Sequence, residues 1–265
     1  MKKKRAAGAS FWNQEADRWG LDQRMGMADV YARDRESSFI LQFLAIVPTS
    51  SVFDFGCGNG WTMSVIARSH PEIVVDGYEP NAKLRKLATS RDAPYTVHAK
   101  VPTKGQFDLV ISQRVLTCID PVHHKKTLEQ LRGLVKPGKF CLLIEAFTDG
   151  LDELNRLRVA MNFRSLVPAK RNVYLEKKHL VALMQSMGFY PIDLGAYSRV
   201  FAHLPPNFLS NYAVAKYIIV PGLATEFQSP CELAGWIDQL LPRNVGNYSP
   251  VQAMLWGLSE SEPKP

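Results

Sequence analysis

The chain has no long hydrophobic run, although 46% of its 265 residues are apolar. The most apolar candidate, residues 212–224, is shorter than the roughly 20 residues that a membrane-spanning helix needs. Lys216 and Pro221 also interrupt it. The basic start Met1–Arg5 is not followed by an apolar stretch, as a secretory signal would be. The sequence therefore predicts a protein without a membrane span, and we expect a cytoplasmic location.

Cysteine is scarce, with four residues at positions 57, 118, 141 and 231. Their spacing matches neither paired metal ligands nor a disulfide framework, which suits a reducing compartment. No clustered acidic set is recognisable either, so the sequence predicts no metal site.

The most informative segment that is present is Val52–Gly60, in which an apolar strand pattern containing Asp54 runs into three alternating glycines. Helical spacing follows over residues 61–69, so we expect a strand, a glycine loop and a helix. A ligand should lie against the loop amides and the helix N-terminus. Trp61 stands where the dinucleotide fingerprint has its third glycine, and the lysine of a phosphate-binding loop is missing. Asp54 would repel a pyrophosphate but attract a cation such as the ammonium of S-adenosylmethionine.

Further strand patterns alternate with helical segments, at residues 73–79, 95–101, 106–112 and 140–144. This alternation predicts a doubly wound α/β fold with a parallel sheet. Glu79 ends the second strand about twenty residues beyond the loop, where a carboxylate accepts hydrogen bonds from ribose hydroxyls. Pro80 is placed to flank an adenine.

The glycine loop, Glu79, the strand at 106–112 and the Lys136-Pro137-Gly138 turn together resemble class I S-adenosylmethionine-dependent methyltransferases over residues 35–147. The resemblance implies a Rossmann-like core at 37–147, a mostly parallel seven-stranded sheet with an antiparallel last strand, and S-adenosylmethionine as cofactor. This chain has Ala99-Lys100 where the family often has an acid, which leaves adenine to backbone groups. The resemblance assigns cofactor contacts to Asp54, Gly56, Cys57, Gly58, Asn59, Gly60, Glu79, Pro80, Ala99, Gln113 and Arg114.

The remaining segments are expected to handle the acceptor. Residues 1–36 read as a basic tail and a helical lid, in which Arg33 or Arg35 either pairs with the cofactor carboxylate or lies on an exposed face. Residues 148–265 are expected to supply substrate-side helices and the last two strands, the first at 189–201. An insertion at about 202–245, with helices near 212–219 and 231–241, is expected between those strands, covering the substrate opening or a partner subunit.

Glu145, at the end of the fifth strand, and His124, in the loop after the fourth, are the candidate general bases. The candidate substrate contacts are Asn155, Arg158, Asn172 and Tyr174.

The short words Leu154–Arg158, Asn172–Tyr174 and Tyr248–Pro250 are similar to methyltransferases of polysaccharide and small-metabolite biosynthesis. They favour O-methylation of a small molecule or sugar by direct in-line transfer. The net charge of +7 keeps an RNA methyltransferase as an alternative. Residues 112–115, however, lack the Asn/Asp-Pro-Pro-aromatic motif of amino-directed DNA enzymes. A cofactor-binding pseudoenzyme is a further alternative, and the oligomeric state stays open.

Overall fold

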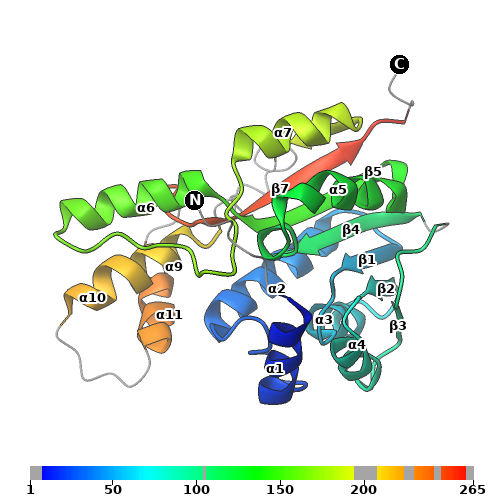
Figure 1. The fold of residues 1–265 in the computed structure, drawn as a ribbon, viewed down its shortest axis with the longest axis horizontal. Coiled ribbons are helices and arrows are strands. Elements are labelled where there is room, and N and C mark those ends of the chain that lie inside the picture. Colours follow the sequence, from blue (N-terminus) through cyan, green and yellow to red (C-terminus); the bar gives the residue numbers. More distant parts are fainter. Residues whose placement is uncertain (1–7, 104–105, 194–207, 224–229, 242–245, 261–265) are drawn as a thin grey trace.

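A computed structural model of the chain describes residues 8–103, 106–193, 208–223, 230–241 and 246–260. Its strands form one seven-stranded sheet in the order β3-β2-β1-β4-β5-β7-β6 (Figure 1). β7 runs antiparallel to both neighbours, and the other pairs are parallel, which confirms the predicted fold class. The strands are β1 (Ser51–Phe55), β2 (Val74–Tyr78), β3 (Tyr95–His98), β4 (Phe107–Gln113), β5 (Val135–Ala146), β6 (Phe189–Ile192) and β7 (Val251–Leu258).

Helices cover both faces of this sheet. The larger buried cluster joins α2, α3 and part of the segment after residue 208 to one face, and the second cluster joins α5 and α7 to the other. The longer helices are α1 (Ala9–Trp19), α2 (Val30–Ile46), α3 (Trp61–Ser69), α4 (Ala82–Thr89), α5 (His124–Leu134), α6 (Thr148–Ala160), α7 (Lys177–Ser186) and α11 (Pro230–Leu240). The shorter ones are η1 (Leu116–Cys118), η2 (Pro121–His123), α9 (Ser210–Val214), η4 (Ala215–Ile219) and α10 (Val220–Gly222).

Several boundaries differ from the sequence expectation. The Lys136-Pro137-Gly138 segment lies inside β5, with Gly138 at φ +74°, and the β4–β5 register shifts there. The lid boundary expected at residue 36 falls inside α2, because the second half of that helix buries Phe39 and Phe43 in the core. β6 occupies residues 189–192, and residues 194–201 of the predicted strand lie outside the described part.

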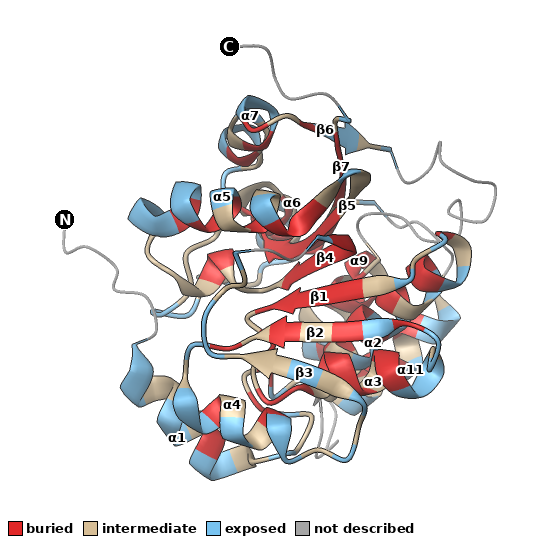
Figure 2. Ribbon diagram, turned by 90° about the vertical axis from the view of Figure 1, so that its right-hand side faces the viewer, coloured by how far each residue is buried: buried red, intermediate tan, exposed pale blue. Residues whose placement is uncertain are grey.

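Aromatic side chains, rather than a helix, cover one face of the sheet at β1, β2 and β3. No helix occurs between β3 and β4 in the residues that the structure describes there, so one face of β1, β2 and β3 is open in the ribbon of Figure 2. The ring of Phe53 packs on Phe107 at 4.9 Å between centroids and on His98 at 6.2 Å. Phe55 packs on Tyr78 with 5.1 Å between ring centroids, so aromatic rings cover this face next to the strand ends.

The segment between β6 and β7 packs against α2. Asp29, the N-cap of α2, accepts hydrogen bonds from the hydroxyl of Tyr212 (2.8 Å) and the ammonium of Lys216. Six residues later, Arg35 forms an ion pair with Asp238 of α11. The two helices predicted within this segment are present, and none of the helices described here is long and apolar enough to cross a membrane.

Candidate functional site

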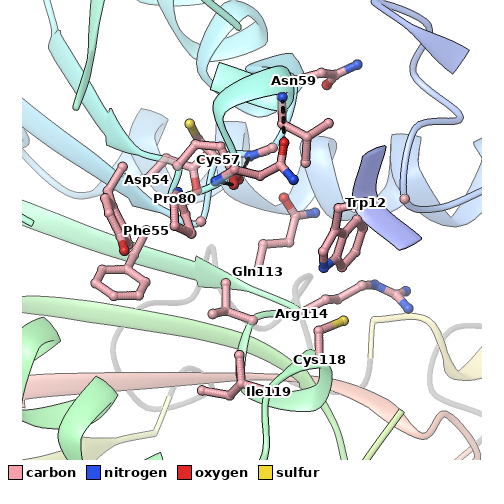
Figure 3. A pocket seen from close by; sticks show the side chains of 18 of the residues that line it. Trp12, Asp54, Phe55, Cys57, Asn59, Pro80, Gln113, Arg114, Cys118 and Ile119 are labelled. Atoms are coloured by element: carbon pink, nitrogen blue, oxygen red, sulfur yellow. Dashed lines mark hydrogen bonds between the residues drawn. The ribbon is translucent and has the colours of Figure 1, made fainter. Parts of the chain in front are cut away.

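A cavity of about 500 Å³ lies at the carboxyl ends of β1, β2 and β4, beneath α1. Figure 3 shows Pro80 and Phe55 at one end and Trp12 at the other, with Gln113, Arg114 and Cys118 along the wall between them. This is the size and position expected for a small-molecule site in an open α/β sheet.

The glycine loop forms one wall with its backbone. Gly56 and Gly58 have φ values of +78° and +59°, which residues with a side chain rarely adopt. The amides of Gly56 and Cys57 donate to the carbonyl of Tyr78 at 2.8 and 3.0 Å, fixing the loop to the end of β2. A Cβ on Gly56 would lie 2.6 Å from Cγ2 of Val115, so glycine is required where the loop meets the segment after β4.

Two buried carboxyl groups flank this loop. Glu79 accepts from the amide of Gly58 (2.9 Å) and from the amide of Asn81 (2.8 Å). Burial raises the pKa of Glu79 to about 7, although these hydrogen bonds oppose the shift. Burial also raises the pKa of Asp54 to about 7, against the attraction of the Arg33 guanidinium. Both carboxyls gain from a cationic ligand beside them, because a positive charge favours their ionised form.

Arg33 of α2 reaches the same cavity, whereas Arg35 points to Asp238. The Nη2 atom of Arg33 donates to the carbonyl of Met25 at 2.7 Å. Its Nε is buried and has no hydrogen-bond partner within the described residues. An incompletely satisfied guanidinium in a cavity wall favours an anionic group of a ligand.

A buried polar network holds the end of β4. Glu36 accepts from Gln113 Nε2 (2.6 Å) and from Nε (2.9 Å) and Nη2 of Arg114, while Thr62 donates to Gln113 (2.7 Å). Arg114 has φ +58°, an uncommon conformation for a residue with a side chain. Sequence reasoning missed Glu36. An acid inside an otherwise apolar helix face was the available signal.

The lid is attached to the glycine loop through Asn59. Its Nδ2 donates to the carbonyls of Gly20 (2.9 Å) and Asp22 (3.0 Å), just beyond α1. Arg91 donates from Nε to the carbonyl of Asn59 at 2.6 Å. The side chain of Trp12 packs over Gly26, so α1 and the segment after it roof the cavity.

Neither candidate base lines the cavity. Glu145 is fully buried and accepts from the amides of Val115 (2.9 Å), Leu116 (2.9 Å) and Thr117 (3.1 Å). It also accepts from the Thr117 hydroxyl at 2.8 Å. His124 lies 2.9 Å from the carbonyl of Leu116, and burial lowers its pKa. A general base must reach the acceptor, directly or through one water. Both side chains hold η1 in this structure, and their role as general bases stays a prediction.

Of the other predicted contact residues, some line the cavity and others do not. Asp54, Gly56, Cys57, Gly58, Asn59, Glu79, Pro80, Gln113, Arg114 and Asn172 line the cavity. Gly60 instead packs against Ala88, and Ala99 is exposed beyond β3.

Three of the predicted substrate contacts face other parts of the chain. Asn155 exchanges hydrogen bonds with the backbone of Leu166 at 2.7 and 3.0 Å. Arg158 binds the carbonyls of Arg164 and Tyr217, and Tyr174 packs against the larger core cluster.

Further cavity residues were not predicted as contacts. They come from the lid, α3, the end of β2, η1 and its surroundings, α5 and the segment before α7, and include Met25, Thr62, Tyr78, Cys118, Ile119, Gln130 and Arg171. No cluster of three His, Cys, Asp or Glu side chains suited to a metal ion occurs in the described ranges.

Comparisons with known proteins agree with this arrangement. A family model described as "Methyltransferase domain" matches residues 30–194, and curated protein sequences give no match. The plantazolicin methyltransferase BpumL, solved with SAH and a pentazolic desmethylPZN analogue, shares the fold with a TM-score of 0.57 at 11% identity. That alignment covers 96% of this chain and 95% of BpumL.

A second BpumL complex, with a triazolic analogue and SAH, gives a TM-score of 0.52 at 12% identity over 96% and 95% of the two chains. Magnesium protoporphyrin IX methyltransferase from Synechocystis PCC 6803, solved with SAH, gives 0.46 at 18% identity over 63% and 78%. The family match spans more than half of the sequence, and its residues form most of the cavity lining just described. The chain therefore belongs to the methyltransferase-domain family, as a class I S-adenosylmethionine-dependent methyltransferase.

Proposed function

We propose that the protein methylates an oxygen atom of a small molecule or sugar, such as a polysaccharide precursor. The observation that carries the proposal is one continuous cavity. It joins the glycine loop and Glu79 to a wall that contains Cys118 and Asn172. A cofactor and a small acceptor then meet within the same cavity.

Residues of this chain fit each part of the cofactor. Glu79 is positioned for the ribose hydroxyls, and Asp54 for the ammonium group. Arg33, with its unpartnered Nε, suits the carboxylate. Pro80 and Ile119 supply apolar surface for the adenine at the end of the cavity where Phe55 lies (Figure 3). When bound, S-adenosylmethionine supplies an already activated methyl group.

The protein's contribution to the reaction is then mainly positioning. The Glu36–Gln113–Arg114 network fixes the end of β4, and Glu145 fixes η1, so the wall facing the acceptor is rigid. Holding two reactants in contact accelerates a displacement without a dedicated base.

Isothermal titration with S-adenosylmethionine tests the cofactor part. A Cβ at Gly58 would lie 2.9 Å from Cε of Met25, so Gly58→Arg fills the cavity. We expect binding by the wild type and at least about a hundredfold loss in Gly58→Arg, about 2.8 kcal/mol. Gly133→Arg is the matched control, because Gly133 is an exposed residue of α5 where a Cβ would have no atom within 4 Å. Failure of the wild type to bind would contradict the proposal.

A methyl-transfer screen tests the acceptor, with nucleotide sugars, glycans, small phenols and RNA as substrates. Transfer to a sugar or phenol oxygen supports the proposal. Transfer to RNA, with salt-sensitive binding that disappears when residues 1–5 are deleted, would instead support the alternative suggested by the +7 net charge. Cofactor binding without transfer to any substrate would indicate a pseudoenzyme.

A further inference from the structure

The cations that line the cavity differ in whether a carboxylate lies beside them. Within the described lining, the cations are Arg33, Arg114 and Arg171, and the anions are Asp54 and Glu79. Arg114 is neutralised by the fully buried carboxylate of Glu36. Arg33 and Asp54 interact with each other and suit the two charged groups of a methionine moiety.

Arg171 has no such partner. No carboxylate forms an ion pair with it in the part of the chain that the structure describes. Its guanidinium carbon lies 4.5 Å from the ring centroid of Phe11 in α1. A cation–π contact of this kind positions the guanidinium without neutralising it.

The segment that carries Arg171 is attached to the acceptor side of the cavity. The amide of Val173 donates to the carbonyl of Thr117 at 2.8 Å, and Thr117 is itself held by Glu145. The neighbouring Asn172 also lines the cavity. Arg171 and Asn172 thus lie beside η1, near the Cys118 thiol. Burial raises the pKa of that thiol to about 11, and the charges of Arg114 and Arg171 oppose the shift.

Arg171 lies exposed at this end of the cavity, where no described lining carboxylate pairs with it. A neutral acceptor would leave the charge uncompensated, whereas an anionic one would neutralise it and accept hydrogen bonds from the guanidinium. We propose that Arg171 and Asn172 form an acceptor subsite for an anionic group, a carboxylate or a phosphate. This inference rests on the proposed methyltransfer to a small molecule.

Titration of SAH-loaded protein with 4-hydroxybenzoate, phenyl phosphate and phenol tests the subsite. We expect at least one of the two anions to bind about tenfold more tightly than phenol, as a charge-assisted hydrogen bond allows. The tighter anion identifies the group as carboxylate or phosphate. In Arg171→Gln this preference should disappear, while the affinity for SAH stays within about twofold. Lys170→Gln, an exposed neighbouring cation outside the cavity lining, should keep the preference.

Several results would overturn the subsite. They are equal binding of phenol and both anions, absence of binding by both anions, or an unchanged preference in Arg171→Gln. Loss of SAH binding by the wild-type protein is a different result, because it contradicts the proposed function itself. The two failures are thereby distinguished in one set of titrations.

Discussion

Individual carboxyl groups in this protein have different roles, which depend on the end of the sheet where they lie and on the groups that their oxygens contact. Asp54 and Glu79 lie at the carboxyl ends of β1 and β2, next to the cavity. Asp108 lies at the opposite end of β4, where it accepts from the amide of Ser50 (2.9 Å) and the ammonium of Lys136 (3.0 Å). Glu145 is at the cavity end of β5 but turns its oxygens to backbone amides.

Glu145→Gln should therefore act on stability more than on chemistry. The glutamine NH₂ group cannot accept from the amides that now donate to the carboxylate, so a buried N–H loses its partner. We expect the free energy of unfolding to fall by about 1–3 kcal/mol, measured by urea denaturation. The kcat of the folded enzyme should fall less than about tenfold. A stable variant with a hundredfold lower kcat would restore Glu145 as a base.

The affinity for S-adenosylmethionine should rise with pH. Burial raises the pKa values of Asp54 and Glu79 to about 7, and the ammonium of the ligand binds the ionised form of Asp54. Binding below pH 7 must then release a proton, so the affinity increases as pH passes through 7. We expect about a tenfold increase from pH 6 to pH 8 for one linked proton. Titration in two buffers of different ionisation enthalpy measures the released proton, and a flat profile would contradict the assignment.

At the scale of elements, α2 connects the cavity to the segment between β6 and β7. Its first turns carry Arg33 and Glu36 on the cavity side, and Asp29 and Arg35 bind residues beyond position 208. A Cβ on Gly235 would clash with the ring of Tyr31, so α11 approaches α2 closely. The described residues beyond position 208 therefore support α2, and α2 in turn supports the cofactor side of the cavity.

Asp29→Ala should show this support. The substitution removes the N-cap acceptor for the amide of Ala32 (3.1 Å) and leaves Tyr212 and Lys216 without that acceptor. We expect a loss of about 2–4 kcal/mol in the free energy of unfolding, since a cap and a half-buried charge partner disappear together. Asp120→Ala is the matched control, because Asp120 caps the short η2 at an exposed site. That variant should lose less than about 1 kcal/mol, and equal losses would contradict the support role.

For the whole molecule, the sequence pattern predicted the sheet and the cofactor end of the cavity but little of the acceptor end. Gly56, Gly58 and Glu79 are adjacent to a strand end, so local patterns and a known spacing place them at the edge of the sheet where the cavity lies. Arg171 reaches the cavity, and Glu36 reaches the lining residues Gln113 and Arg114, only through contacts between distant parts of the chain, which no local period reveals. The partners of Asn155 and Arg158 likewise belong to other segments, which a local pattern does not reveal.

The position of β7 also determines when the strand pairs of the sheet can form during synthesis. β7 lies between β5 and β6, although it follows both in the chain. Glu145 pairs with Gln252 across the β5–β7 ladder, and Phe189 with Leu258 across the β6–β7 ladder. During synthesis, a nascent chain that has passed residue 192 still lacks these ladders for the further seconds needed to make β7. β6 can therefore join the sheet only after the last strand has been made.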